Sequence, residues 1–352
     1  MEDQFILHEP VTLVDQLSAS WQAPSNIALV KYWGKHGVQL PANPSISFTL
    51  SDCKTITTLT AIKAVKHGFE IKLDGKLKPS FAPKIESYFK RIISYSPWIK
   101  EYYFTIETTN TFPHSSGIAS SASSMAALSS CIVDLESQLT GTDIDLKKAS
   151  FLARLGSGSA CRSLEGKLVV WGSHDETSGS SDLFGVDVSQ SLHAVFQDYQ
   201  DTILLVDKGE KTVSSTVGHE LMNEHAFAKA RFHQAHSNLT AIKECLYTGD
   251  LDGFIKITES EALTLHAMMM TSHPYFILMK PNTLSIIEEI WAYRKETGVP
   301  VCFTLDAGAN VHMLYPAAHK DTVEQLIKSK LAQYCQNEQY ICDAIGSGAT
   351  AV

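Results

Sequence analysis

The sequence lacks the features that mark several broad classes of protein. Charged residues make up only 19% of its 352 residues, and the net charge is −9. A chain with this balance is not expected to bind nucleic acid or an anionic membrane surface. No apolar run approaches the roughly 20 residues that span a bilayer. The start of the chain has neither the basic residues nor the apolar core of a signal peptide. We therefore expect a globular, cytoplasmic protein.

A pattern of paired cysteines is also missing. The seven cysteines are an odd number, and no two of them have CxxC spacing. We expect free, mostly buried thiols in a reducing compartment rather than disulfides or a zinc site. Internal repeats and low-complexity linkers are absent as well. The cysteines are Cys53, Cys131, Cys161, Cys245, Cys302, Cys335 and Cys342.

Strand-like segments are frequent in the first half of the chain. Residues 45–62 are rich in β-branched side chains, residues 69–73 alternate apolar and charged side chains, and residues 102–108 have a similar strand character. Asp74-Gly75 follows the second of these segments and predicts a hairpin turn. Residues 167–171 are the next predicted strand.

Helical patterns dominate the remainder. Small apolar residues at 119–138 predict a buried helix, and a second helix is expected at 146–155. A new strand at 202–207 places a domain boundary near residue 200, which divides the chain into domains 1–199 and 200–352. After this boundary we expect helices, then strands, and a last helix. These segments are residues 219–248, 252–269 and 283–297, then 300–305 and 311–315, then 320–336.

A loop rich in serine and glycine precedes the predicted buried helix. It contains Pro113-His114-Ser115-Ser116-Gly117-Ile118-Ala119-Ser120-Ser121. Small residues let the backbone approach a ligand closely, and the free amides at a helix start favour phosphate. No Gly-Lys-Ser/Thr follows, so this is not a Walker A loop. Taken alone, a serine-rich N-cap is the simpler interpretation.

Two lysines flank an aromatic pair in the segment Lys31-Tyr32-Trp33-Gly34-Lys35, which follows an apolar stretch containing Asn26. Lysine is a mobile point charge suited to phosphate groups. The spacing of four places both lysines on one helix face, or lets them reach one site from an extended turn. Taken alone, a surface turn whose aromatic rings pack at the edge of the core is the simpler interpretation.

Two further stretches combine small residues with a charge. Gly156-Ser157-Gly158-Ser159-Ala160-Cys161-Arg162-Ser163 contains an arginine, whose planar fork matches a carboxylate. Asp306 follows a predicted strand and precedes a glycine turn, a common place for catalytic groups in α/β proteins. Taken alone, a helix C-cap followed by a surface arginine is the simpler interpretation of the first stretch. For the second, a turn aspartate and a catalytic aspartate are equally plausible interpretations. The weaker stretch around Ser215 and Thr216 is by itself an N-cap run.

The order of these stretches resembles the diphosphomevalonate decarboxylase branch of the GHMP kinase superfamily. Pro113-x-x-x-Gly117-Ile118-x-Ser120-Ser121-Ala122 is similar to the superfamily's phosphate-binding motif, with Ile118 where leucine is usual. The motifs Ala-Pro-x-Asn-Ile-Ala-x-x-Lys-Tyr-Trp-Gly-Lys, Gly-Ser-Gly-Ser-Ala-Cys-Arg-Ser and Asp-Ala-Gly-x-Asn resemble that branch specifically. The resemblance runs from about residue 22 to residue 315. It implies an α+β, two-domain GHMP kinase fold with a deep cleft between the domains.

The same resemblance implies an activity. The expected reaction is ATP-dependent decarboxylation of mevalonate 5-diphosphate to isopentenyl diphosphate, with release of ADP, phosphate and CO₂. ATP is the implied co-substrate and Mg²⁺ the implied cofactor, although no metal ligands are assigned. The other implied partner is a second copy of the chain, in a homodimer.

The resemblance also implies roles for individual residues. Asp306 orients the tertiary 3-hydroxyl and acts as the base, Lys31 tunes this carboxylate, and Arg162 clamps the substrate carboxylate. Ser121, with Ser120, lies near the transferred phosphoryl group and Mg²⁺. The implied ATP-binding residues are Pro113, Ser115, Ser116, Gly117, Ala119, Ser120 and Ser121. The implied substrate-binding residues are Asn26, Tyr32, Lys35, Lys84, Ser157, Gly158, Ser159, Arg162, Ser215 and Thr216.

Some positions depart from the family pattern. Lys84 corresponds to a substrate-binding arginine, and lysine lacks the bidentate fork. The loop from Pro113 to Gly117 replaces a more apolar Pro-Thr-Ala-Ala-Gly, and His36-Gly37 stands where charged residues are usual. The same chemistry on mevalonate 5-phosphate therefore stays an alternative.

Two other functions are also alternatives: a mevalonate 3-kinase that does not decarboxylate, and a non-catalytic protein that binds ATP or an isoprenoid precursor. The joint presence of Asp306, Arg162 and the phosphate loop argues against both, because together they are what an active site requires.

Overall fold

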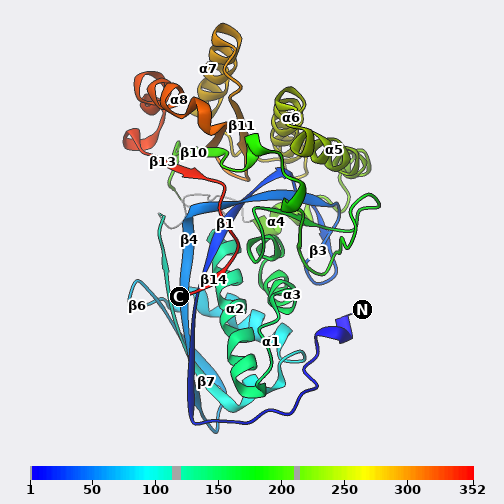
Figure 1. Cartoon of the computed structure of the whole chain (residues 1–352), viewed down its shortest axis with the longest axis vertical. Coiled ribbons are helices and arrows are strands. Elements are labelled where there is room, and N and C mark those ends of the chain that lie inside the picture. Colours follow the sequence, from blue (N-terminus) through cyan, green and yellow to red (C-terminus); the bar gives the residue numbers. More distant parts are fainter. Residues whose placement is uncertain (1, 113–119, 210–214) are drawn as a thin grey trace.

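Two β-sheets organise the chain, which we describe from a computed structural model covering residues 2–112, 120–209 and 215–352. Among these residues, the larger sheet has the strand order β14-β1-β4-β7-β5-β6, with β8 and β9 attached to β4. The smaller sheet has the order β11-β12-β10-β13. Figure 1 shows the smaller sheet and its helices above the larger sheet, along the longest axis of the molecule.

Two long antiparallel strands, β1 (Gln16–Val30) and β4 (Ser45–Lys63), form the centre of the larger sheet. β7 (Tyr102–Asn110) pairs antiparallel with β4, and β5 (Gly68–Leu73) lies parallel to β7. The many β-branched residues of β4 favour an extended backbone. Its second half alternates buried and more exposed positions, because one face lies against the core. The three strands predicted in this region are confirmed.

Shorter strands complete the larger sheet. β5 turns into β6 (Lys76–Leu77) through Asp74-Gly75, whose φ angles are 51° and 75°, so the predicted hairpin turn is confirmed. β8 (Leu168–Trp171), also predicted, pairs with β4 and with β9 (Val186–Asp187). A separate small hairpin joins β2 (Lys35–His36) to β3 (Leu40–Pro41).

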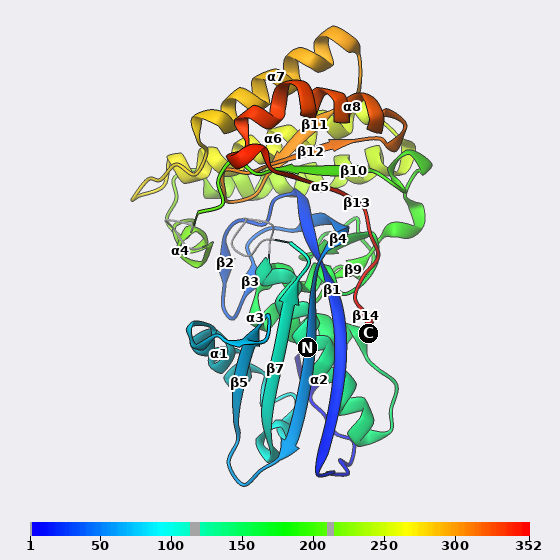
Figure 2. The ribbon, with the colours of Figure 1, turned by 90° about the vertical axis from the view of Figure 1, so that its left-hand side faces the viewer.

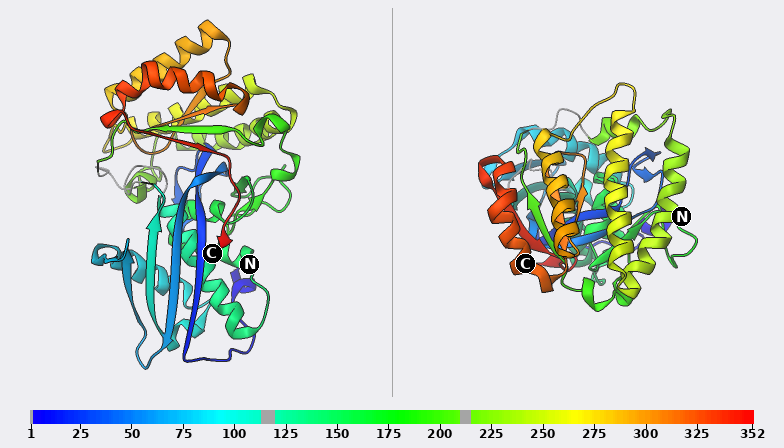
Figure 3. Two further views of the ribbon diagram at one scale, coloured as in Figure 1. Left: turned by 60° about the vertical axis from the view of Figure 1, so that its left-hand side comes forward. Right: turned by 90° about the horizontal axis from the view of Figure 1, so that it is seen from above.

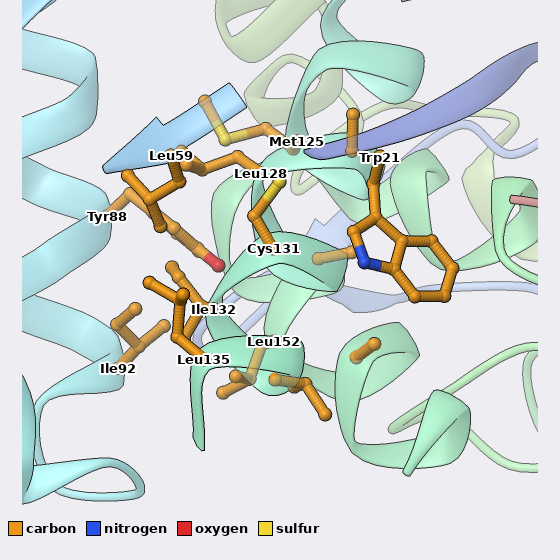
Figure 4. Packing of buried hydrophobic residues seen from close by; sticks show 14 of the residues in the cluster. Trp21, Leu59, Tyr88, Ile92, Met125, Leu128, Cys131, Ile132, Leu135 and Leu152 are labelled. Carbon is orange, nitrogen blue, oxygen red and sulfur yellow. The ribbon is translucent and has the colours of Figure 1, made fainter. Parts of the chain in front are cut away.

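Three helices cover one face of the larger sheet: α1 (Ala82–Ile92), α2 (Ser120–Thr140) and α3 (Leu146–Gly156). α2 lies nearest the sheet, where its small side chains allow close packing against β1 and β4. The predicted buried helix is thereby confirmed over the described residues. Figure 4 shows α2 side chains packed among those of β1, β4, α1 and α3; the labelled residues are Trp21, Leu59, Tyr88, Ile92, Met125, Leu128, Cys131, Ile132, Leu135 and Leu152.

The smaller sheet consists of β10 (Gln200–Leu204), β11 (Cys302–Leu305), β12 (Val311–Tyr315) and β13 (Tyr340–Ala344), all paired antiparallel. The side chains of α7 (Pro281–Thr297) and α8 (Lys320–Leu326) share a core with one face of this sheet. α5 (Ala228–Thr248) and α6 (Leu251–Met270) share a core with its other face. Figure 3 shows α5, α6 and α7 side by side from above.

Two predicted helices are shorter than expected. The segment 219–248 contains α4 (Ser215–Glu220) and α5, separated by non-helical residues 221–227. The ring of His225 accepts a hydrogen bond from the Phe227 amide at 3.1 Å, and this side-chain bond competes with helix formation. The segment 320–336 is α8 followed by a π turn at Ile327–Leu331 and a 3₁₀ turn at Ala332–Tyr334.

The ends of β1 and β4 connect the two sheets. Ile27 and Phe48 lie in the same apolar cluster as Ile203 of the smaller sheet and Leu239 of α5. The two halves therefore share a continuous buried core. The position of the domain boundary near residue 200 stays a prediction.

The chain returns to the larger sheet after β13 (Figure 2). β14 (Thr350–Ala351) pairs antiparallel with β1 at Trp21 and Gln22. Gly346 lies where an added Cβ would be 2.5 Å from the Leu50 carbonyl oxygen, so only glycine fits this close crossing.

All seven cysteines are free, as predicted, and only Cys342 among them is exposed. Within the described ranges, no helix combines the length and the hydropathy that a membrane span needs.

Asp343 is predicted to be important for joining β13 to β4. Its carboxylate accepts hydrogen bonds from the amides of Ser51 and Asp52, both at 2.9 Å, and of Cys53 at 2.7 Å. Asp343→Ala leaves these amides without their acceptor, and we expect it to lower the free energy of unfolding by about 3 kcal/mol. Urea unfolding measures this, with the exposed Asp175→Ala as a control; equal stability of the two variants would contradict the prediction.

Candidate active site

An ion pair joins the two halves of the molecule. Lys31 follows the last residue of β1, and Asp306 follows the last residue of β11. Lys31 Nζ donates a hydrogen bond to Asp306 Oδ1 at 3.1 Å. The lysine side chain is 2% exposed and the aspartate side chain 27%, so the carboxylate is the more accessible member of the pair. The structure thus brings together two predicted site residues that lie far apart in the sequence.

Burial lowers the pKa of Lys31, because desolvation disfavours the charged ammonium, while the charge of Asp306 acts in the opposite direction. The His266 ring lies behind the aspartate, with Nε2 at 3.1 Å from the Asp306 carbonyl oxygen. A carbonyl only accepts, so Nε2 carries the proton. Burial lowers the pKa of His266 to about 4, and the ring is neutral near pH 7.

Arg162 is a buried cation held by neutral groups. It lies in a 3₁₀ helix at Gly158–Ser163, donates to Ser45 Oγ at 2.5 Å, and contacts Asn26 Oδ1 at 3.4 Å through two nitrogens. Its guanidinium also lies 5.7 Å from the Trp171 ring centroid. Among the described residues it forms no ion pair. Burial lowers its pKa, yet a guanidinium keeps its charge, so this position favours an anionic ligand.

Asn26 connects β1 to the glycine-serine segment. Its amide nitrogen donates to Ser163 Oγ at 2.8 Å and to the Ser159 carbonyl oxygen at 3.1 Å, while its oxygen faces Arg162. Gly158 lies where an added Cβ would be 2.7 Å from the Trp171 ring and 3.0 Å from the Tyr32 hydroxyl. The segment therefore requires glycine at this position for a steric reason.

Tyr32 and Lys35 lie on either side of the turn after β1. The Tyr32 ring packs edge-on against Trp171 at 4.6 Å, and burial raises the pKa of its hydroxyl. Lys35 opens β2, with Nζ 3.5 Å from Gln39 Oε1, and burial lowers its pKa. The two lysines of this motif thus lie on an extended turn, the second of the two predicted arrangements.

The start of α2 lies beside the glycine-serine segment. Ser121 Oγ is 3.4 Å from Ser157 Oγ, which places the predicted ATP-binding and substrate-binding hydroxyls next to one another. The Ser120 carbonyl oxygen accepts a bond from Ser124 within the helix. The other predicted loop residues, Pro113, Ser115, Ser116, Gly117 and Ala119, lie outside the described residues. Ser215 and Thr216 begin α4, but their side chains are outside the described part of the chain as well.

Lys84 projects from α1 onto the wall of a cavity of about 130 Å³. Its side chain is exposed to this cavity, yet the protein atoms around it lower its pKa through desolvation. Ser120 and Ser121 line the same cavity, so Lys84 lies near the start of α2. The rest of the wall is mostly apolar: Ile71, Phe81, Ile85, Ile106, Met125 and Leu128.

His219 of α4 packs against the lysine-aromatic motif. Its ring lies 4.2 Å from the Tyr32 ring and 4.6 Å from the Trp33 ring, and Nδ1 accepts the Gly34 amide at 3.0 Å. The neighbouring Gly218 lies where an added Cβ would be 2.6 Å from Trp33. These contacts place α4, which carries Ser215 and Thr216, directly on the motif.

Two models of known families cover most of the chain. One, described as Diphosphomevalonate decarboxylase-like N-terminal domain, matches residues 23–182. The other, described as Mevalonate 5-diphosphate decarboxylase C-terminal domain, matches residues 202–348. The chain belongs to the diphosphomevalonate decarboxylase family.

Individual members of the family are similar over nearly their whole length. The diphosphomevalonate decarboxylase of Candida albicans is 30% identical over 88% of this chain and 87% of its own, and that of Ganoderma lucidum is 32% identical over 88% and 81%. A solved mevalonate diphosphate decarboxylase from Staphylococcus aureus has a TM-score of 0.83 at 28% identity, with 96% and 98% of the two chains covered. The Enterococcus faecalis enzyme gives 0.82 at 27%, with 96% and 99% covered. The expected α+β GHMP kinase fold is confirmed.

Several residues around the site of this family member were not predicted from sequence. Ser45 binds Arg162, His266 binds the Asp306 backbone, and Glu261 binds the Lys31 amide. Glu261 shares a buried face of α6 with Thr258, Ala262 and Leu265. In the sequence, Glu261 is recognisable only as a charged residue at a helical position that should be buried. Because charges are rarely buried without a partner, such a position predicts one.

Metal binding by protein side chains alone is not indicated. Within residues 2–112, 120–209 and 215–352, no three His, Cys, Asp or Glu side chains are placed to hold an ion. Among the described residues, the hydroxyls at the start of α2 are oxygen donors beside the glycine-serine segment. This donor set fits Mg²⁺, which is typically bound by one or two protein oxygens together with phosphates and water.

The His219 contacts predict a loss of stability in acid. Burial lowers the pKa of His219 to about 3, below the ordinary value of 6.5. The unfolded chain therefore binds the proton first, and the stability present above pH 6.5 is lost as the pH falls toward 3. By pH 5 the loss from this residue amounts to about 2 kcal/mol.

We expect His219→Asn to lose less stability than the parent chain between pH 7 and pH 5. Guanidinium unfolding at both values measures the difference, and the exposed His8→Asn is the control. Identical pH dependence in the parent and His219→Asn would contradict the prediction.

Proposed function

We propose that the chain catalyses ATP-dependent decarboxylation of mevalonate 5-diphosphate to isopentenyl diphosphate, with release of ADP, phosphate and CO₂. The observation that carries this proposal is Arg162, a buried cation with neutral hydrogen-bond partners, in a site that also contains the Lys31–Asp306 pair. A substrate carboxylate supplies the missing counter-charge. Relatives solved as "MDDEF in complex with MVAPP, AMPPCP and Magnesium" support the same substrates and Mg²⁺.

The first step is phosphoryl transfer to the 3-hydroxyl. The Asp306 carboxylate accepts the hydroxyl proton as the oxygen attacks the γ-phosphorus, and the bond from that phosphorus to ADP breaks. Lys31 holds Oδ1 at 3.1 Å, which fixes the orientation of the carboxylate beside the substrate. A tertiary hydroxyl is a crowded nucleophile, so its orientation matters as much as its deprotonation.

The second step removes the new phosphate and the carboxylate. The C3–O bond breaks and phosphate departs with its electron pair. The electrons of the C1–C2 bond then form the C2–C3 double bond, and C1 leaves as CO₂. Arg162 holds the carboxylate in the orientation that this bond cleavage needs.

The start of α2 serves the ATP phosphates in this proposal. Ser120 and Ser121, with Pro113, Ser115, Ser116, Gly117 and Ala119 of the preceding loop, bind them through hydroxyls and amides. Ser121 also acts near the transferred phosphoryl group. Mg²⁺ bound with ATP would neutralise charge on the phosphates, and the hydroxyls of Ser120 and Ser121 would lie near it.

The substrate diphosphate is assigned to the lysine-aromatic motif and the glycine-serine segment. Tyr32, Lys35, Ser157, Ser159 and Lys84 are its proposed ligands, with Gly158 giving the backbone room to approach. Asn26 positions Arg162, and Ser215 and Thr216 approach the phosphates from α4. Lys84 lacks the bidentate fork of the arginine that it replaces, so mevalonate 5-phosphate stays the alternative substrate.

A homodimer and a cytoplasmic location belong to the same proposal and rest on the family resemblance. Light scattering after size exclusion tests the dimer: a single species with twice the chain mass supports it, and the mass of one chain rejects it.

The substrate is tested by incubating the protein with ATP, Mg²⁺ and either mevalonate 5-diphosphate or mevalonate 5-phosphate. We expect equimolar CO₂ and ADP, with mevalonate 5-diphosphate as the better substrate. ADP without CO₂ would indicate a 3-kinase. Absence of both products with either substrate would leave only a binding function.

Substitution of the two charged groups separates their proposed roles. We expect Asp306→Asn to lower kcat by about 10²- to 10⁴-fold, because asparagine cannot act as the base. ATP binding should be retained, because the side chain keeps nearly the same volume. In Arg162→Gln, formation of both ADP and CO₂ should fall. Near-normal turnover in either variant would remove that residue from its role, and the exposed Asp175→Asn is the control.

A further inference from the structure

A second buried ion pair holds the backbone of Lys31. Glu261 of α6 accepts a hydrogen bond from the Lys31 amide at 2.9 Å, and Arg231 of α5 donates to the Lys31 carbonyl oxygen at 3.2 Å. The two side chains also bind one another, through Arg231 Nη1 at 2.8 Å and Nη2 at 2.5 Å. The backbone amide and the backbone carbonyl oxygen of Lys31 are therefore both bound by one ion pair from the other half of the molecule.

The carboxylate of Glu261 is saturated. Asn238 of α5 donates to Glu261 Oε1 at 2.5 Å, in addition to the Lys31 amide and the two guanidinium bonds. The exposed fractions of the Arg231 and Glu261 side chains are only 1% and 0%. On the other side, Asn43 donates to the same Lys31 carbonyl oxygen at 3.0 Å. The position of the Lys31 backbone is thus fixed by groups from three segments.

Stability alone does not account for such a pair. Desolvation of two charges opposes folding, and well-packed apolar residues of similar volume stabilise a core equally well or better. What apolar residues do not provide is a fixed position for one amide and one carbonyl. This position matters for Lys31, because its Nζ meets Asp306 from the opposite sheet.

We propose that Arg231 and Glu261 are positioning residues for the reaction, which hold Lys31 in register with Asp306 across the two halves of the molecule. This inference rests on the proposed function. Neither residue is assigned to contact substrate; they act through the Lys31 backbone. A displacement of about 1 Å at a reacting group is enough to slow an enzyme by about 100-fold.

The charge of Glu261 also acts on Lys31 directly. The charged and titratable groups that face Lys31 are Asp306, Glu261, Arg162, Arg231 and His266. Burial lowers the pKa of Lys31, and the charges of Asp306 and Glu261 oppose this effect. Without the Glu261 charge, Lys31 therefore loses its proton at a lower pH.

The helix α6 offers a matched control. Glu259 lies two positions before Glu261 and also forms an ion pair with an arginine, Arg294, at 2.7 Å, with a further bond from Trp291 at 2.9 Å. Its side chain is 10% exposed and faces α7 rather than Lys31. Glu259→Gln therefore breaks a comparable pair on the same helix without touching the Lys31 backbone.

The experiment compares Glu261→Gln with Glu259→Gln in the full chain, with kcat, the KM for ATP and the pH profile of kcat as readouts. We expect Glu261→Gln to lower kcat by about 10- to 100-fold, to change the KM for ATP less than about 2-fold, and to move the alkaline limb of the profile to lower pH. Glu259→Gln should leave kcat and the alkaline limb unchanged. The thermal stability of both variants is measured in parallel.

A milder variant keeps the test usable if Glu261→Gln does not fold. Asn238→Leu removes one hydrogen bond to Glu261 and leaves its charge in place, and kcat should fall several-fold with the alkaline limb unchanged. Unchanged kcat in the folded Glu261→Gln or Asn238→Leu protein would overturn the inference, as would equal effects of Glu261→Gln and Glu259→Gln. The proposed function is judged separately, on CO₂ from the parent chain; its absence rejects both.

Discussion

The contact between Lys31 and Asp306 is the constraint that the rest of the structure satisfies. Each residue follows the last position of a strand, and the two strands belong to different sheets. The pair exists only when β1 extends far enough to reach the smaller sheet and when the β11–β12 hairpin turns at the right residue. The apolar core that joins the ends of β1 and β4 to α5 fixes this distance. The site therefore forms only when the two halves of the molecule pack together.

The site contains buried positive charges, although the molecule as a whole has a negative net charge. The chain carries a net charge of −9, yet two buried cations, Lys31 and Arg162, lie close enough for the charge of Arg162 to lower the pKa of Lys31. Arg162 has neutral oxygen atoms and an aromatic ring as its direct contacts, and the charge of Asp306 acts on it from a greater distance. The side chain of Lys31 binds the Asp306 carboxylate, and its backbone amide binds the Glu261 carboxylate. A buried arginine without an ion-pair partner among the described residues thus favours an anionic ligand at this point of an otherwise acidic protein.

Much of the fold followed from local sequence. The strand at 311–315 and the helix beginning at residue 146 have the predicted starts, because β-branched runs and helical periodicity are properties of neighbouring residues. The break between α4 and α5 was missed, since it depends on the bonds of the His225 side chain. The terminal strand β14 was missed too, because its partner, β1, is distant in sequence.

The site was only partly predictable. Asp306 and Arg162 were found as motif residues, and their roles came from a family resemblance, since nothing local relates positions 275 residues apart such as Lys31 and Asp306. Glu261 and His219 were not found. Helical periodicity tells which face of a helix is buried, but it does not tell which distant backbone group a charged or aromatic residue on that face will bind. Such partners are set by packing alone.

The return of the chain to the larger sheet bears on the order in which the protein is made. β14 lies beside Trp21 and Gln22, but it is synthesised after the whole smaller sheet. While the ribosome is still translating the second half, β1 has an unpaired edge over these residues. Exposed strand edges are templates for association with other chains. The nascent first half must therefore remain unaggregated until residues 350–351 have emerged, because only then is this part of the β1 edge covered.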